Sequence, residues 1–191
     1  MTIKPDAAYL SGLDFFGDVV ARVPPGAWEQ PSPCRGWTAR DVVGHVGGAV
    51  RFGTGLLGGS APEWRPADPP GSAVEGDPAA WWAALVPPAR AALEGVDLAR
   101  VVESPFGRRT IGEGLSFPAV DLFVHGWDLG RAAGLAVEIP AEAIDFAREM
   151  LGRLPAEQIR ATSVFGAEVD APPGATASET FLAWTGRDPR G

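Results

Sequence analysis

The chain has 191 residues, of which 46% are hydrophobic, so it can bury a good-sized core as one domain without disulfides. The formal net charge is -8 and Lys4 is the only lysine, which argues against a nucleic-acid partner, because phosphate binding needs clustered positive charge. Cys34 is the only cysteine, which excludes an internal disulfide and a cysteine-based zinc cage.

The chain shows no sign of a membrane or secretory segment. No run of about 18 apolar residues appears, and the first residues lead into an amphipathic stretch, not an unbroken apolar one. We therefore expect no membrane span and no signal peptide. A cytoplasmic location is expected, and a lone cysteine fits such a reducing compartment.

The first two predicted elements are helices. Apolar residues spaced three and four apart predict an amphipathic helix over residues 5–23, which ends at a Pro-Pro-Gly sequence. After a loop rich in proline, Thr38 is a predicted N-cap with an acidic residue, Asp41, three positions on. A second helix should therefore begin at Ala39 and carry His45 on its apolar face.

The middle of the chain is less regular. Residues 58–77 are dense in Gly, Pro and Ser, which predicts a long surface loop anchored by Trp64. A helical pattern follows over residues 81–93, and the Pro87-Pro88 pair should kink or split it. Residues 100–111 have β-branched flanks around a Pro-Phe-Gly sequence and predict a small β-hairpin.

Two more helices are predicted before a C-terminal tail. Pro118 near its start and Gly134 past its end predict a helix over residues 117–133. Another is predicted over residues 141–154, closed by Pro155. The expected fold is mainly α within a single domain, with a helical bundle over about residues 5–155 and a docked tail over residues 156–191.

Residues 120–129 of this predicted helix are apolar on nearly every face except at Asp121, His125 and Asp128. At about 100° per residue, these three side chains lie within about 60° of one another. Burying such polar groups without partners costs about 1 to 3 kcal/mol each, so these three side chains need hydrogen-bond partners or a bound ion.

The chain has only two histidines, and a bundle can bring His45 toward the pair formed by Asp121 and His125. Two imidazoles and one carboxylate would hold a divalent metal and leave positions open for water or substrate. Zinc is the leading candidate, and nickel, manganese and iron(II) are compatible. Spacing alone fits core histidines hydrogen-bonded to backbone or aspartate equally well.

Two further residues near this set are functional candidates. Asp128 is better explained as an acceptor that orients His125 than as a fourth ligand. Cys34 precedes the second helix and has the chemistry of a reactive thiol, although a lone cysteine is more often inert.

Three segments resemble a known family: residues 33–46 (PCRGWTARDVVGHV), residues 121–134 (DLFVHGWDLGRAAG) and residues 182–189 (LAWTGRDP). They resemble the actinobacterial metal-binding proteins related to the N-terminal domain of mycothiol-dependent maleylpyruvate isomerase, in the DinB-like superfamily. The resemblance implies a four-helix bundle whose metal ligands map onto His45, Asp121 and His125. For the best-known members it also implies a low-molecular-weight thiol, mycothiol, whose sulfur approaches the metal and acts as nucleophile.

Two departures limit this resemblance. The isomerase has glutamate where this chain has Asp121, and it has a separate C-terminal domain that helps to bind substrate. We therefore expect a metal- and thiol-dependent transferase or isomerase of unknown substrate, with a small molecule or thiol as its partner. The alternatives are a non-catalytic metal- or small-molecule-binding protein on the same scaffold, and a purely structural helical protein. Pairing into a homodimer is left open.

Overall fold

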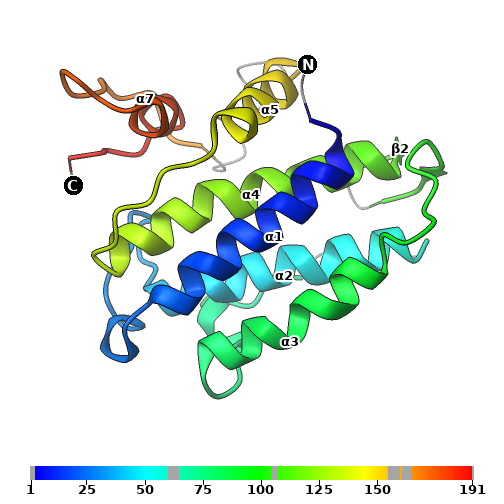
Figure 1. Ribbon diagram of the computed structural model, residues 1–191, viewed down its shortest axis with the longest axis horizontal. Coiled ribbons are helices and arrows are strands. Elements are labelled where there is room, and N and C mark those ends of the chain that lie inside the picture. The colour runs from blue at the N-terminus through cyan, green and yellow to red at the C-terminus, as the bar shows by residue number, and fades with distance from the viewer. Residues whose placement is uncertain (1–2, 60–64, 105–106, 155–159, 161–164, 191) are drawn as a thin grey trace. The chain divides into compact units, whose positions relative to one another are not determined.

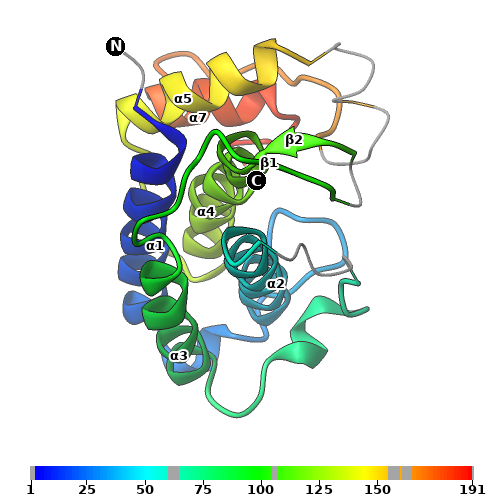
Figure 2. The ribbon, with the colours of Figure 1, turned by 90° about the vertical axis from the view of Figure 1, so that its right-hand side faces the viewer.

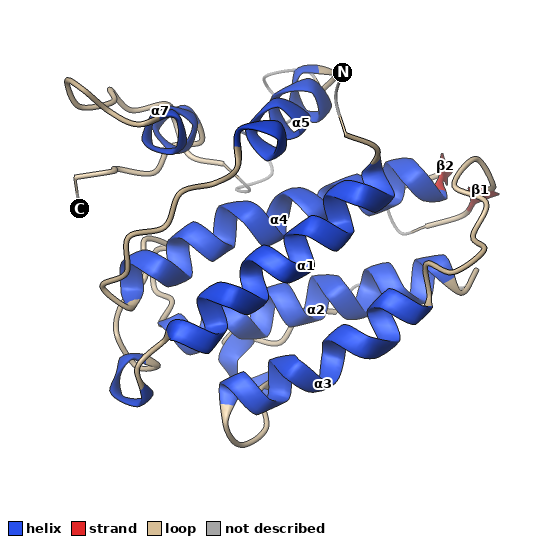
Figure 3. Cartoon of the chain, in the orientation of Figure 1, coloured by secondary structure: helices blue, strands red, loops and turns tan. Residues whose placement is uncertain are grey.

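The structure is a computed structural model that describes residues 3–59, 65–104, 107–154, 160 and 165–190. The chain divides into two compact units, Lys4–Val137 and Glu138–Gly191, the second of which also includes Met1–Ile3. Helices dominate the described residues, and a two-stranded antiparallel sheet is the only sheet among them (Figure 3). The predicted mainly α fold is confirmed.

The first unit is built from four helices, α1 (Pro5–Arg22), α2 (Ala39–Leu57), α3 (Pro78–Ala91) and α4 (Ile111–Ala132). Helix α1 packs against α4 and α3, and α2 also packs against α4 and α3, so the four close into a bundle (Figures 1 and 2). Short 3₁₀ turns, η1 (Pro25–Ala27) and η2 (Pro70–Ala73), lie in its connections.

Glycines allow α1 and α4 to pack closely beside the polar stripe of α4. A Cβ on Gly12 would lie 2.9 Å from the Cβ of Leu122. A Cβ on Gly126 would lie 2.5 Å from Cε1 of Phe15. A side chain would not fit at either position, so these two contacts fix how far α4 is shifted along its axis relative to α1.

Helix α2 begins at Ala39, as predicted, with a capping box. Thr38 accepts a hydrogen bond from the backbone of Asp41, and the Asp41 carboxylate accepts one from the backbone N–H of Thr38. The other carboxylate oxygen of Asp41 accepts a 2.8 Å bond from the N–H of Gly71 in η2. Burial raises the pKa of Asp41, but these hydrogen bonds outweigh it and leave the pKa below its usual value.

The predicted start of the fourth helix at residue 117 is wrong, because α4 begins six residues earlier, at Ile111. Thr110 and Glu113 form a second capping box, which satisfies the first free N–H groups of the helix. Pro118 therefore lies inside the helix and not near its start. The Thr-x-x-Glu pattern at residues 110–113 was the sequence signal for this start.

Helix α3 is continuous through Pro87 and Pro88, so these prolines do not split it. Each proline lacks the N–H that would bond the carbonyl four residues earlier, yet the helix runs on to Ala91. The predicted hairpin is confirmed, since β1 (Val101–Val102) pairs antiparallel with β2 (Arg109–Thr110). The predicted anchor Trp64 lies outside the described residues.

The second unit contains α5 (Ala141–Gly152) and α7 (Ala177–Trp184), which pack on each other. Ser178 is fully buried and its hydroxyl accepts a 2.7 Å bond from the N–H of Ile139, which joins the start of this unit to α7. Helix α5 ends two residues before its predicted end, and Pro155 lies outside the described residues. No helix among the described residues is long and apolar enough to cross a membrane.

Candidate metal centre

Helices α2 and α4 bring the three predicted ligands together. Nε2 of His45 lies 3.5 Å from a carboxylate oxygen of Asp121. The ring centroids of His45 and His125 are 4.7 Å apart, with an edge-to-face angle of 72°. One donor atom from each of the three residues lies within 4.8 Å of the others.

These distances suit a divalent ion. Ligand bonds of about 2.1 Å at tetrahedral angles place two donor atoms about 3.4 Å apart. The separation of 3.5 Å between His45 and Asp121 already matches this value. The side chains of His45, Asp121 and His125 are 19%, 28% and 11% exposed, so the cluster is reached from solvent and is not sealed in the core. The donor set therefore fits an open metal site.

Asp128 fixes the orientation of His125. The Asp128 carboxylate is fully buried, and one of its oxygens lies 2.9 Å from Nδ1 of His125, which precedes Asp128 by three residues on α4. Because Nδ1 is engaged there, Nε2 remains as the ligand atom of this imidazole. Burial lowers the pKa of His125, although Asp128 opposes this, and the neutral ring is the form that ligates a metal.

Cys34 lies closer to the site than the sequence indicated. Its Sγ is 3.2 Å from the same Asp128 oxygen and 3.7 Å from Nδ1 of His125. Cys34, His125 and Asp128 thus form a second group with metal-ligand chemistry. A tight turn holds the thiol there, since the N–H of Trp37 bonds the Cys34 carbonyl at 2.9 Å and Gly36 has a φ of +80°.

The same turn places Trp37 over the two imidazoles. Its ring centroid lies 4.9 Å from that of His45 and 6.0 Å from that of His125. The indole therefore packs beside both histidines of the candidate site. No periodicity in this loop could have revealed which rings Trp37 contacts.

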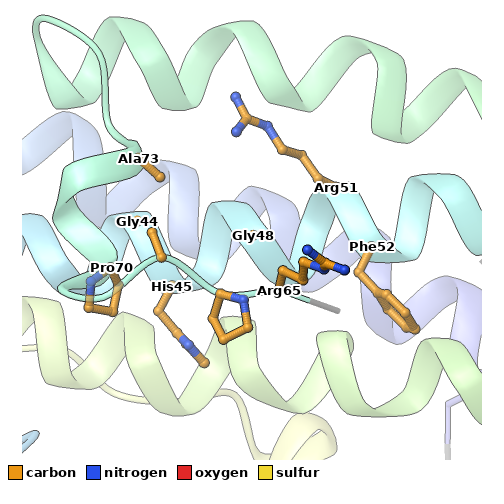
Figure 4. Close-up of a pocket in the computed structure, with 10 residues that line it drawn as sticks. Gly44, His45, Gly48, Arg51, Phe52, Arg65, Pro70 and Ala73 are labelled. Carbon is orange, nitrogen blue, oxygen red and sulfur yellow. The ribbon is translucent and has the colours of Figure 1, made fainter. Parts of the chain in front are cut away.

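A pocket of about 220 Å³ opens on α2 beside the cluster, and His45 is one of its walls. Figure 4 shows His45, Gly44, Pro70 and Ala73 toward one end of the pocket and Arg51, Arg65 and Phe52 toward the other. The loop that carries η2 forms the wall opposite α2.

Comparisons with known proteins place this geometry in context. The family model described as the mycothiol maleylpyruvate isomerase N-terminal domain matches residues 10–130. The crystal structure of the mycothiol-dependent maleylpyruvate isomerase is 18% identical, with a TM-score of 0.65, and that of a histidine-to-alanine mutant is 16% identical, with a TM-score of 0.64. Each match covers 90% of this chain and 77% of the other. No curated protein matches the chain.

Proposed function

The chain belongs to the family of mycothiol maleylpyruvate isomerase N-terminal domains, and we propose that it is a metal-dependent transferase or isomerase that uses a low-molecular-weight thiol such as mycothiol. One observation carries the proposal. The two histidines of the chain meet Asp121 at the contact between α2 and α4, beside a pocket that shares His45. A purely structural role predicts a dry core around both histidines, whereas His45 and Asp121 are partly exposed and His45 lines a pocket.

Each residue of the site has a role in this proposal. His45, Asp121 and His125 hold the divalent ion, with zinc as the leading candidate, and Asp121 reduces the charge of the filled site to +1. A divalent ion lowers the pKa of a coordinating thiol, so that its sulfur becomes a nucleophile at neutral pH. Asp128 keeps a proton on Nδ1 of His125, and Trp37 packs beside both imidazoles.

A metal titration tests the site. We expect the purified protein to bind one equivalent of zinc, and His45→Ala and His125→Ala to lose it. Asp121→Asn should weaken zinc binding, whereas Asp18→Asn, at an exposed position on α1, is the matched control and should not. Stoichiometric zinc in both histidine variants would defeat the assignment.

A second experiment separates the enzyme from its main alternative, a non-catalytic metal- or small-molecule-binding protein on the same scaffold. The zinc-loaded protein is incubated with mycothiol and a panel of electrophilic substrates. Turnover that is lost in His125→Ala supports the enzyme. Zinc binding without adduct or turnover across the panel would favour the binding protein.

A further inference from the structure

We propose that Cys34 is a positioning residue of the candidate metal site, because its thiol donates to Asp128 and so holds that carboxylate against Nδ1 of His125. This inference rests on the proposed function, since the imidazole that is positioned is a proposed zinc ligand. It gives Cys34 a role that is exerted through Asp128, and not a role as a metal ligand or as a nucleophile.

The Cys34 thiol has two acceptors within reach, and the distances favour one of them. Its Sγ lies 3.2 Å from Oδ2 of Asp128 and 3.7 Å from Nδ1 of His125. A thiol that donated to Nδ1 would favour the tautomer with the proton on Nε2, the nitrogen that would otherwise bind the metal. Donation to Asp128 leaves Nδ1–H free to donate to the same oxygen. The shorter contact is therefore also the one that keeps Nε2 available.

The Asp128 carboxylate is oriented by the protein and not by solvent, because it is fully buried. Its Oδ2 lies within hydrogen-bond distance of both the imidazole and the thiol, which suits the two lone pairs of a carboxylate oxygen. Removing the thiol would leave this buried charged group with one donor fewer, and such a loss is costly in a low-dielectric interior. Cys34 thus stabilises the orientation of Asp128 that His125 requires.

The loop that precedes α2 holds the thiol in a defined position. Oγ of Ser32 accepts a 3.2 Å bond from the N–H of Cys34 and donates at 3.0 Å to the carbonyl of Trp37. An isolated antiparallel bridge joins Pro31 to Thr38, which is the N-cap of α2. Because the loop closes on itself and runs directly into α2, the thiol is positioned by the helix that carries the other imidazole.

The same loop contacts the metal site a second time, through Trp37. The indole centroid lies 4.9 Å from that of His45 and 6.0 Å from that of His125. The loop therefore reaches the imidazole pair in two independent ways, by a hydrogen-bonded carboxylate and by ring contacts. Both contacts link the segment before α2 to α4 at the point where the ligands converge, which is the arrangement expected of a loop that positions them.

A double-mutant cycle on zinc affinity tests whether Cys34 acts through Asp128. Cys34→Ala should weaken zinc binding about fivefold, less than the loss expected for Asp128 itself. In the Asp128→Asn background the same change should weaken it less than about twofold, because the group through which Cys34 acts is already altered. Cys34→Ser keeps a donor and should recover most of the lost affinity. Ser116→Ala, which removes a buried hydroxyl that donates to the Gly112 carbonyl on α4, is the matched control and should have no effect.

NMR of the zinc-free protein at neutral pH gives a readout that does not depend on the metal. The ¹⁵N shifts of the His125 ring report which nitrogen carries the proton. We expect the Nδ1–H tautomer in the wild type, in Cys34→Ser and in Ser116→Ala, and a larger share of the Nε2–H tautomer in Cys34→Ala. Wild-type protein that binds no zinc would defeat the metal site, and the tautomer of the zinc-free protein would still decide the role of Cys34.

Three results would overturn the inference. The first is a cycle in which the losses of zinc affinity from Cys34→Ala and Asp128→Asn simply add. The second is an equal loss in Cys34→Ser and Cys34→Ala, which would show that the donated hydrogen bond is irrelevant. The third is an unchanged His125 tautomer in zinc-free Cys34→Ala.

Discussion

The substitution Asp128→Asn isolates the part that a buried carboxylate plays in the candidate metal site. Asp128 is fully buried, and one of its oxygens lies 2.9 Å from Nδ1 of His125 and 3.2 Å from Sγ of Cys34. Asparagine has nearly the same volume, so the change removes a charge and a charge-assisted hydrogen bond without opening a cavity. None of the three proposed metal ligands is altered in identity.

The expected effect is a loss of zinc affinity of about 10- to 100-fold, the range for removing a group that orients a ligating histidine. This corresponds to about 1.4 to 2.7 kcal/mol. Without the carboxylate, the Nδ1–H tautomer of His125 is no longer favoured, and Nε2 is less often free to bind zinc. Competition with a chromophoric chelator at neutral pH measures the affinity.

Asp41→Asn is the matched control for this experiment. Asp41 is also a buried, hydrogen-bonded carboxylate, but its partners are in the α2 cap and η2 and not in the metal site. This variant should lower the thermal midpoint and leave zinc affinity within about twofold. If Asp128→Asn keeps wild-type affinity with an intact circular dichroism spectrum, the orienting role of Asp128 is refuted.

Three further predictions concern the surroundings of the site. Gly44→Ala should lower the free energy of unfolding by about 1 to 3 kcal/mol, since its Cβ would meet a carbonyl oxygen at 2.2 Å; an unchanged urea midpoint would contradict the close packing of η2 on α2. The pKa of Asp41 lies below the unfolded value of about 3.9, so its stabilising contribution is present above that pH and is lost as pH falls through the folded pKa. Unfolding measured between pH 6 and 2 should therefore depend less on pH in Asp41→Asn, and equal slopes would argue against the shift. Cobalt-substituted protein should show no sulfur-to-metal charge-transfer band until mycothiol is added, because the Cys34 thiol bonds Asp128 and is not a metal ligand. If the protein shows this band without mycothiol, and Cys34→Ser abolishes it, Cys34 is a metal ligand.

The convergence of the histidines could be predicted from the sequence because the signal is local. Asp121 and His125 lie four residues apart on an apolar helix, and His45 is the only other histidine in the chain. Polar side chains on apolar, buried helices need a hydrogen-bond partner or a ligand, and in a bundle the neighbouring helix is the nearest source of one. The start of α4 is also encoded locally, in the capping box at residues 110–113, whereas Pro118 lies inside the helix and does not mark its start.

The position of Cys34 and the pocket on α2 could not be predicted in this way. The thiol reaches Asp128 across 94 residues, and the turn that places it has no periodic pattern. The pocket wall comes from a Gly- and Pro-rich loop whose attachment depends on one carboxylate, Asp41, and on the absence of a side chain at Gly44. Such contacts depend on tertiary packing, which neither helical period nor capping patterns report.

The energetics of the α2–α4 contact favour a functional reading of its polar groups. Asp128 is fully buried, and His125 nearly so, among the apolar residues of α4, and burial of a carboxylate is unfavourable even when it is hydrogen-bonded. Apolar residues of similar size would pack there at no such cost. An ion that binds the folded chain and not the unfolded chain would offset this cost, so zinc should raise the thermal midpoint in proportion to the logarithm of its free concentration. This rise should vanish in His45→Ala, where the buried pair on α4 remains but the set of ligands is incomplete.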